Sequence, residues 1–103
     1  MPAPTAETLM RARYSAFALG DLTYLLSSWH PSTRPAALEL DPARSWVRLE
    51  ILDATDGGPF ADTGEVEFRA HHRTGAVRGV QHERSRFARR RGRWYYLDGV
   101  TAS

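Results

Sequence analysis

The chain has 103 residues, of which 42% are hydrophobic and 25% are charged, and its formal net charge is +2. This length and composition are typical of one globular domain, so we expect a single domain over residues 1–103. The charge is too small to indicate a nucleic-acid-binding protein, and we expect no nucleic-acid partner. The absence of cysteine excludes disulfides and thiolate metal sites.

The sequence also lacks the features of membrane and secreted proteins. No apolar run approaches the roughly 20 residues that are needed to cross a bilayer. The residues from Met1 to Thr5 show neither the basic start nor the apolar run of a signal peptide. We therefore expect a cytoplasmic protein with no membrane partner.

The first third of the chain predicts two helices. Thr5 is an N-cap residue for a helix over residues 6–19, and Gly20 provides the usual C-terminal stop. Asp21 is the N-cap of a second helix over residues 22–29, which ends before the following His-Pro pair because the residue before proline avoids helical geometry. The two helices are therefore expected to be consecutive and joined by a tight turn.

The remaining chain predicts one short helical turn and then four strands. An Asp-Pro pair indicates a helical turn over residues 42–45. Alternating apolar and polar residues predict strands over 46–52, 65–70, 77–89 and 94–98, separated by glycine-containing turns. Helices followed by an antiparallel meander indicate an α+β fold, with the helices packed on a strongly bent four-strand sheet.

A charged residue lies in the middle of the apolar face of the first helix. At 3.6 residues per turn, Arg13 shares this face with Phe17. A buried charge requires a partner, because an unpaired one costs several kcal/mol. If Phe87 points into the core, the period of two places Ser85 and Glu83 on the same inward face. We therefore predict that Arg13 and Glu83 contact one another inside the domain.

This pair has two interpretations. It is either a structural ion pair that ties the first helix to the sheet, or part of a polar pocket that binds an anionic or hydrogen-bonding small molecule. Aromatic side chains with polar tips suit the walls of such a pocket, although they equally suit a core. The candidates are Tyr14, Tyr24, Trp29, Trp46, Trp94 and Tyr96.

His30 follows the second predicted helix and also has two interpretations. It is a general base, since imidazole titrates near neutrality, or a cap at the helix C-terminus, where a positive charge is favoured. The predicted pocket residues are Arg13, Tyr14, Trp29, His30, Glu83, Ser85, Trp94 and Tyr96. None of them is assigned a catalytic role.

We expect no metal and no other cofactor. His71 and His72 are adjacent on a strand and point to opposite faces, and together with His82 they do not match the spacing of metal ligands. The acidic residues of 53–62 lack the pattern of a calcium loop. The basic turn at residues 89–93 either contacts RNA or an acidic protein, or is a solvated turn that keeps a sheet edge soluble.

Long segments of the chain resemble a known bacterial family. Residues 9–17 and 20–35, and residues 82–87 and 92–99, are similar to the NTF2-like domain of the YchJ-like, SEC-C-associated proteins. The resemblance implies an NTF2-like, cystatin-like cone, in which N-terminal helices pack on a strongly curved antiparallel sheet. Members of that family usually join this domain to cysteine-rich, zinc-binding SEC-C segments. Since this chain has no cysteine, zinc binding is not carried over.

Two functions follow as hypotheses. The first is a non-enzymatic module that binds a small molecule or a protein partner and has a polar cone interior. The alternative is a small-molecule lyase or isomerase that works by proton transfer in the cone. We also expect a homodimer through the outer sheet face, with Trp46, Arg48 and Glu50 exposed there, because a small bent sheet cannot cover both faces with its own helices.

Overall fold

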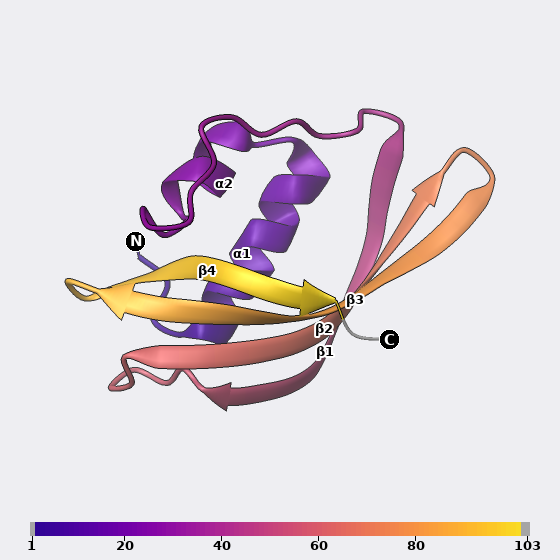
Figure 1. The fold of residues 1–103 in the computed structure, drawn as a ribbon. Coiled ribbons are helices and arrows are strands. Elements are labelled where there is room, and N and C mark those ends of the chain that lie inside the picture. Colours follow the sequence, from indigo (N-terminus) through magenta and orange to yellow (C-terminus); the bar gives the residue numbers. More distant parts are fainter. Residues whose placement is uncertain (1, 102–103) are drawn as a thin grey trace.

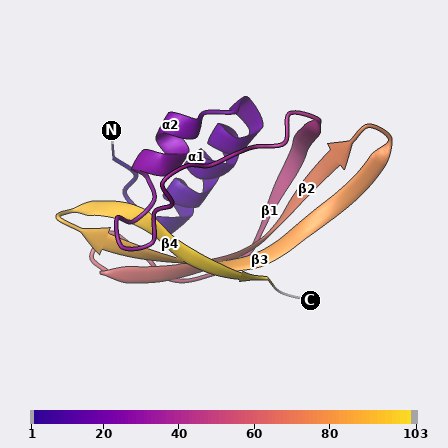
Figure 2. The same cartoon turned by 45° about the horizontal axis from the view of Figure 1, so that its top comes forward.

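The computed structural model describes residues 2–101 and has two helices and four strands in chain order (Figure 1). They are α1 (Ala6–Leu19), α2 (Leu22–Ser27), β1 (Arg44–Asp56), β2 (Thr63–Thr74), β3 (Val77–Arg90) and β4 (Arg93–Thr101). The strands form one antiparallel sheet in the order β1-β2-β3-β4, and both helices lie over its concave face (Figure 2). The expected α+β architecture is confirmed, and the sheet is open rather than closed into a barrel.

The predicted start and end of α1 are confirmed. The Thr5 side chain accepts a hydrogen bond from the backbone N–H of Thr8 at 3.1 Å, as an N-cap does. Gly20 has a φ of 72°, the left-handed conformation that glycine adopts most easily at a helix end. Asp21 then caps α2 by accepting a hydrogen bond from the N–H of Tyr24 at 3.0 Å. These local signals fix the tight turn between the two helices.

The second helix ends two residues earlier than predicted, at Ser27 rather than Trp29. The reason is a tertiary contact. The backbone N–H of Tyr96 in β4 donates to the carbonyl of Ser28 at 2.9 Å, and the N–H of His30 donates to the carbonyl of Tyr96 at 2.7 Å. The segment after α2 therefore pairs with the edge of β4, and it holds Trp29 beside the sheet.

The short helix predicted over residues 42–45 is not formed. Instead, the Asp41 side chain accepts a hydrogen bond from the N–H of Ala43 at 2.9 Å, and its carbonyl accepts one from Arg44 at 3.1 Å. This is a turn that leads directly into β1. A single helical turn fixes several residues for one hydrogen bond, so pairing of Arg44 with Thr74 of β2 prevails.

Three bulges accompany the strong curvature of the sheet. In β1, Val47 and Leu52 are extra residues relative to β2, and in β4, Leu97 is an extra residue relative to β3. A bulge bends its strand and increases the local twist. The long β1, β2 and β3 strands accordingly curve up beside α1, while their other ends lie beneath it (Figures 1 and 2).

The core lies between α1 and the concave face of the sheet. Its buried members are Ala6, Leu9, Met10, Val66, Phe68, Ala70, Phe87 and Trp94. Beneath the N-terminus of α1, the backbones of Gly57 and Gly64 pass so close that a Cβ atom on Gly64 would lie 2.5 Å from the Gly57 Cα.

Among residues 2–101, neither helix has the length and hydropathy required to cross a membrane.

Candidate functional site

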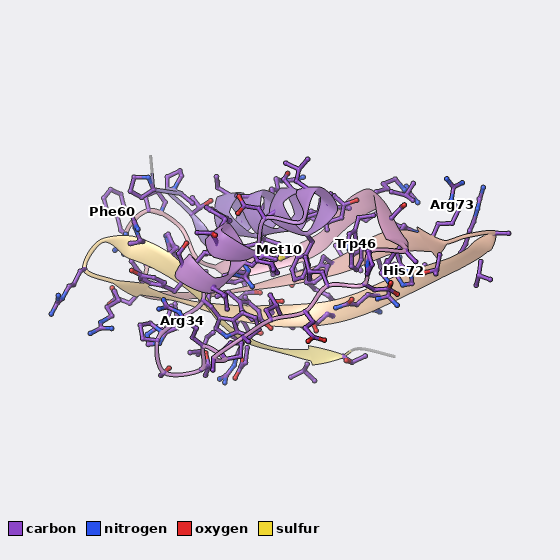
Figure 3. The ribbon with its side chains drawn as sticks, turned by 90° about the horizontal axis from the view of Figure 1, so that it is seen from above. Met10, Arg34, Trp46, Phe60, His72 and Arg73 are labelled. Atoms are coloured by element: carbon purple, nitrogen blue, oxygen red, sulfur yellow. The ribbon has the colours of Figure 1, made fainter. Side chains whose placement is uncertain are left out.

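A cavity of about 410 Å³ lies between α1, the loop before β1 and the concave face of the sheet. This volume is within the range of small-molecule sites. Its lining residues are Met10, Arg13, Tyr14, Phe17, Trp29, Leu38, Glu39, Leu40, Asp41, Arg44, Trp46, Phe68, Ala70, Gln81, Glu83, Ser85 and Tyr96. Figure 3 shows two of them, Met10 and Trp46, with His72 and Arg73 beyond them toward the β2–β3 turn.

Trp46 forms part of the aromatic wall of the cavity. Its ring centroid lies 6.2 Å from that of Tyr14 and 6.0 Å from that of Phe17, both on α1. The expectation that Trp46 lies on the outer face is therefore wrong. The bulge at Val47 shifts the alternation, so that Trp46 turns inward and Val47 is 63% exposed.

Arg13 is buried, with only 3% of its surface exposed. Its Nη1 atom donates to the carbonyl of Leu25 at 2.8 Å and to Oγ of Ser28 at 2.6 Å. Its Cζ atom lies 4.5 Å from the ring centroid of Tyr96 and 5.2 Å from that of Trp29. Burial lowers the pKa of Arg13 to about 10, so the guanidinium remains charged at neutral pH.

The predicted contact between Arg13 and Glu83 is wrong. Although both residues line the cavity, they form no ion pair in the structure of residues 2–101. Arg13 instead reaches the C-terminal end of α2, where backbone carbonyls lack helical partners, and it stacks on aromatic rings. No pattern in the sequence marks this combination of carbonyl, hydroxyl and ring faces as the partner of a buried arginine.

Glu83 has the inward orientation predicted from the period of two. Gln81, Glu83 and Ser85 all line the cavity, which confirms the register of this part of β3. The Oγ atom of Ser85 donates to a carboxylate oxygen of Glu83 at 3.3 Å. The side chain of Glu83 lies over Gly99 of β4, where a Cβ atom would approach its Cδ to 2.8 Å. The glycine thus provides the space that the carboxylate occupies.

The charges of both Arg13 and Glu83 act on the phenol of Tyr96. Burial and the negative charge of Glu83 raise the pKa of Tyr96 to about 12, and the positive charge of Arg13 opposes this shift. Its ring also contacts Trp29 edge-on, with the centroids 5.0 Å apart. The phenol is consequently protonated at neutral pH and can act as a hydrogen-bond donor in the cavity wall.

Six of the eight predicted pocket residues line the cavity: Arg13, Tyr14, Trp29, Glu83, Ser85 and Tyr96. His30 and Trp94 do not belong to this lining. The ring nitrogen Nδ1 of His30 accepts from the backbone N–H of Ser32 at 3.1 Å, and Ser28 is the C-cap of α2, so the helix-cap interpretation of His30 is wrong. Trp94 is a core residue whose Nε1 donates to the carbonyl of Pro4 at 3.3 Å.

The lining includes residues that the sequence did not reveal. Met10 and Phe17 could have been found, since they share the helix face of Arg13. The loop residues from Leu38 to Asp41 belong to no periodic element, so nothing in the sequence placed them at the cavity. They contribute the side chains of Glu39 and Asp41 to the lining.

Two of the three histidines on the sheet pair with carboxylates, whereas Nδ1 of His72 is buried and has no partner among residues 2–101. His71 lies 2.5 Å from a carboxylate oxygen of Glu50, and His82 lies 2.7 Å from one of Glu67. Within residues 2–101, no three histidine, aspartate or glutamate side chains are gathered as metal ligands would be. The cavity itself offers charges, hydrogen-bonding groups and aromatic walls.

The family model and the similar sequences point to the same protein family. The model of the YchJ middle NTF2-like domain matches residues 5–99. A UPF0225 protein of Streptomyces coelicolor is 59% identical over 97 residues, which cover 94% of this chain and 75% of the relative. A UPF0225 protein of Corynebacterium efficiens is 54% identical over 100 residues, which cover 97% of this chain and 76% of the relative.

Solved structures agree with the sequence matches. A SEC-C motif-containing protein from Rhodopseudomonas palustris superimposes with a TM-score of 0.85 at 32% identity, covering all of this chain and 83% of that one. A SEC-C motif-containing protein from Psychrobacter arcticus gives a TM-score of 0.77 at 29% identity, covering all of this chain and 64% of that one. The curved sheet, the two helices over it and these matches show that the chain belongs to the family of YchJ middle NTF2-like domains.

Proposed function

We propose that this domain is a non-enzymatic module that binds a small molecule in its cone. The observation that carries the proposal is the cavity of about 410 Å³, which combines aromatic walls with the charged side chains of Arg13 and Glu83. Ligand sites are mostly apolar and contain a few polar groups that fix orientation. This cavity has that composition, whereas a purely structural interior would bury apolar groups or paired charges.

The alternative, a lyase or isomerase, requires a proton-transfer pair that faces the substrate. His30, the residue expected as a base, does not line the cavity and is hydrogen-bonded to Ser32. Tyr96 does line it, but a pKa of about 12 makes it a weak acid at neutral pH. These observations favour binding over catalysis.

A thermal-shift screen against a metabolite library tests the proposal, since a ligand at 100 times its dissociation constant adds about 2.7 kcal/mol of stability. The variant Ala70→Leu would place a larger side chain on the cavity wall, while Ala54→Leu would do so at an exposed position of β1. We expect a ligand to raise the melting temperature of the original chain and of Ala54→Leu. The same ligand should leave the melting temperature of Ala70→Leu unchanged. Hits that are insensitive to Ala70→Leu, or turnover of a hit compound, would contradict the proposal.

A further inference from the structure

Two opposite charges line the same cavity without pairing with each other. Arg13 is held by α2, and Glu83 is held by Ser85 over Gly99. We propose that the ligand is a small zwitterion, an α-amino acid with an apolar side chain, whose carboxylate faces Arg13 and whose ammonium faces Glu83. This inference rests on the proposed function and specifies the chemical class of its ligand.

Arg13 retains hydrogen-bonding capacity toward the cavity. Both of its hydrogen bonds start from Nη1, and in the structure of residues 2–101 no protein acceptor is found for Nε or Nη2. A guanidinium has five N–H donors in a planar fork that matches a carboxylate. Because Arg13 itself lines the cavity, this fork is available to an anionic group there.

Trp29 adds a second donor. Its indole N–H is buried and has no acceptor within the described part of the chain. The centroid of this ring lies 5.2 Å from the guanidinium carbon of Arg13, and both residues line the cavity. A buried donor without an acceptor is destabilising, and a ligand carboxylate would supply the missing acceptor.

Glu83 provides the negative charge for the ligand ammonium. A carboxylate has about four acceptor positions, and Ser85 uses one of them. No arginine or histidine of residues 2–101 forms an ion pair with Glu83, although Arg48, Arg84 and Arg86 all find carboxylates on the outer face. An ammonium group has three donors and would neutralise this charge.

Much of the cavity wall is apolar. Phe17, Trp46 and Phe68 line the cavity together with Met10, and they offer contacts to a hydrocarbon or aromatic side chain. A simple anion would leave Glu83 facing its charge, and a simple amine would face Arg13. A molecule that carries both charges and an apolar group matches Arg13, Glu83 and the apolar wall, while Glu39, Asp41 and Arg44 add charges of both signs to the rest of the lining.

Calorimetric titration with matched probes tests this inference. The probes are leucine, methionine and phenylalanine, together with phenethylamine and phenylpropionate, which each lack one of the two charged groups of phenylalanine. We expect at least one amino acid to bind at least tenfold more tightly than either single-charge probe. If no amino acid binds at millimolar concentration, the zwitterion is excluded, and hits of another class that Ala70→Leu abolishes would leave the proposed binding function standing.

Two variants locate the charges. Glu83→Gln should weaken the binding amino acid at least tenfold and leave phenylpropionate binding unchanged or stronger. Trp29→Phe keeps an aromatic ring but removes the N–H, and it should weaken binding of the amino acid and of phenylpropionate while leaving binding of phenethylamine unaffected. Arg86→Gln removes a charge that pairs with Asp98 on the outer face and is the matched control. Equal losses in Glu83→Gln and Arg86→Gln would overturn the assignment.

Discussion

Arg13 shows how a protein can bury a charge without a carboxylate. The guanidinium is tied to the carbonyl of Leu25 and the hydroxyl of Ser28, and its face lies on the rings of Tyr96 and Trp29. Each contact stabilises the buried positive charge, and together the contacts connect α1, α2 and β4. This one side chain therefore holds three elements around the cavity.

Replacing Arg13 by Met should destabilise the domain by about 2 kcal/mol, because hydrogen bonds to charged groups contribute about 1.5–3 kcal/mol and the stem alone keeps the packing. Ser28→Ala removes only one acceptor and should cost about 1 kcal/mol. Urea denaturation measures both changes. A more stable Arg13→Met would show that the cost of burying the charge exceeds the contribution of its contacts.

The Arg13 and Glu83 charges do not pair, so their coupling should be small, although both line one cavity and both act on Tyr96. We expect the effects of Arg13→Met and Glu83→Gln on the free energy of unfolding to add within about 1 kcal/mol. A double-mutant cycle in urea gives this value. A coupling energy above about 1 kcal/mol would mean that the two side chains meet in solution.

For individual residues, the period-two alternation correctly predicted which side chains of β3 point inward, including Glu83 and Ser85. It failed for Trp46, because the inserted residue Val47 reverses the pattern and no turn residue marks the insertion. It also could not supply the partners of Arg13, since the approach of α2 is a tertiary event. Helix periodicity showed that Arg13 is buried but not what surrounds it.

The contact between α1 and the β1–β2 turn depends on two glycines. Gly57 has a φ of 75°, and its carbonyl accepts a hydrogen bond from the N–H of Ala6 at 3.0 Å. A Cβ atom on Gly64 would lie 2.5 Å from the Cα of Gly57 and 3.2 Å from the Cβ of Ala6. Backbone rather than flexible side chain blocks this position, so the helix and the turn would have to separate.

Gly64→Ala should therefore cost on the order of 2–3 kcal/mol, as overpacking does. Gly58→Ala is the matched control, because nothing lies within 4 Å of its added Cβ, and it should change stability by less than about 0.5 kcal/mol. Thermal denaturation of both variants checks this. Similar melting temperatures for the two would show that the close approach is not rigid.

The outer face of the sheet is stabilised by ion pairs between strands. Arg84 of β3 bonds to Glu65 at 2.5 Å and to Glu67 at 3.2 Å, both on β2, and to Asp53 of β1 at 3.1 Å. A hydrogen bond from His82, assisted by Arg84, lowers the pKa of Glu67 below its ordinary value. Three strands are thus connected by charges on the face opposite to the cavity.

The lowered pKa of Glu67 predicts an acid dependence. In the unfolded chain Glu67 titrates near 4.5, and in the folded chain it titrates lower. The stabilisation of the folded chain by the charged Glu67 carboxylate is therefore complete above pH 4.5, and it is lost as the pH falls through the folded pKa. Glu67→Gln should lose less stability between pH 6 and pH 3 than the original chain does, as measured by urea midpoints. An identical loss would show that the His82 contact contributes nothing.

For the molecule as a whole, the order of the elements and the antiparallel meander followed from the sequence, because turn glycines and alternating patterns separate the strands. The strand lengths did not, since Arg44, Ser45 and the residues flanking the other turns join the ladder only through pairing with neighbours. The cavity depends on curvature, and curvature depends on bulges and on the loop from Leu38 to Asp41. These are the features that local patterns describe least well.

A homodimer through the outer sheet face stays a prediction. This face carries the ion pairs of Arg48, Arg84 and Arg86, so a second copy would have to preserve or exchange them. Sedimentation at micromolar concentration should give twice the chain mass of 11.6 kDa, and Arg84→Glu should shift it toward the monomer. A single 11.6 kDa species would exclude the dimer.

The bulges of β1 have a consequence beyond the shape of the cone. β1 is a terminal strand of the sheet, and an unpaired edge is a template on which another chain can add a strand. Val47 and Leu52 are exposed on it and would favour such growth. Because an extra residue at each of these positions interrupts the regular spacing of free N–H and C=O groups, an incoming strand can bond only over short stretches. The same insertions that bend the sheet thereby protect it from fibril-like self-association.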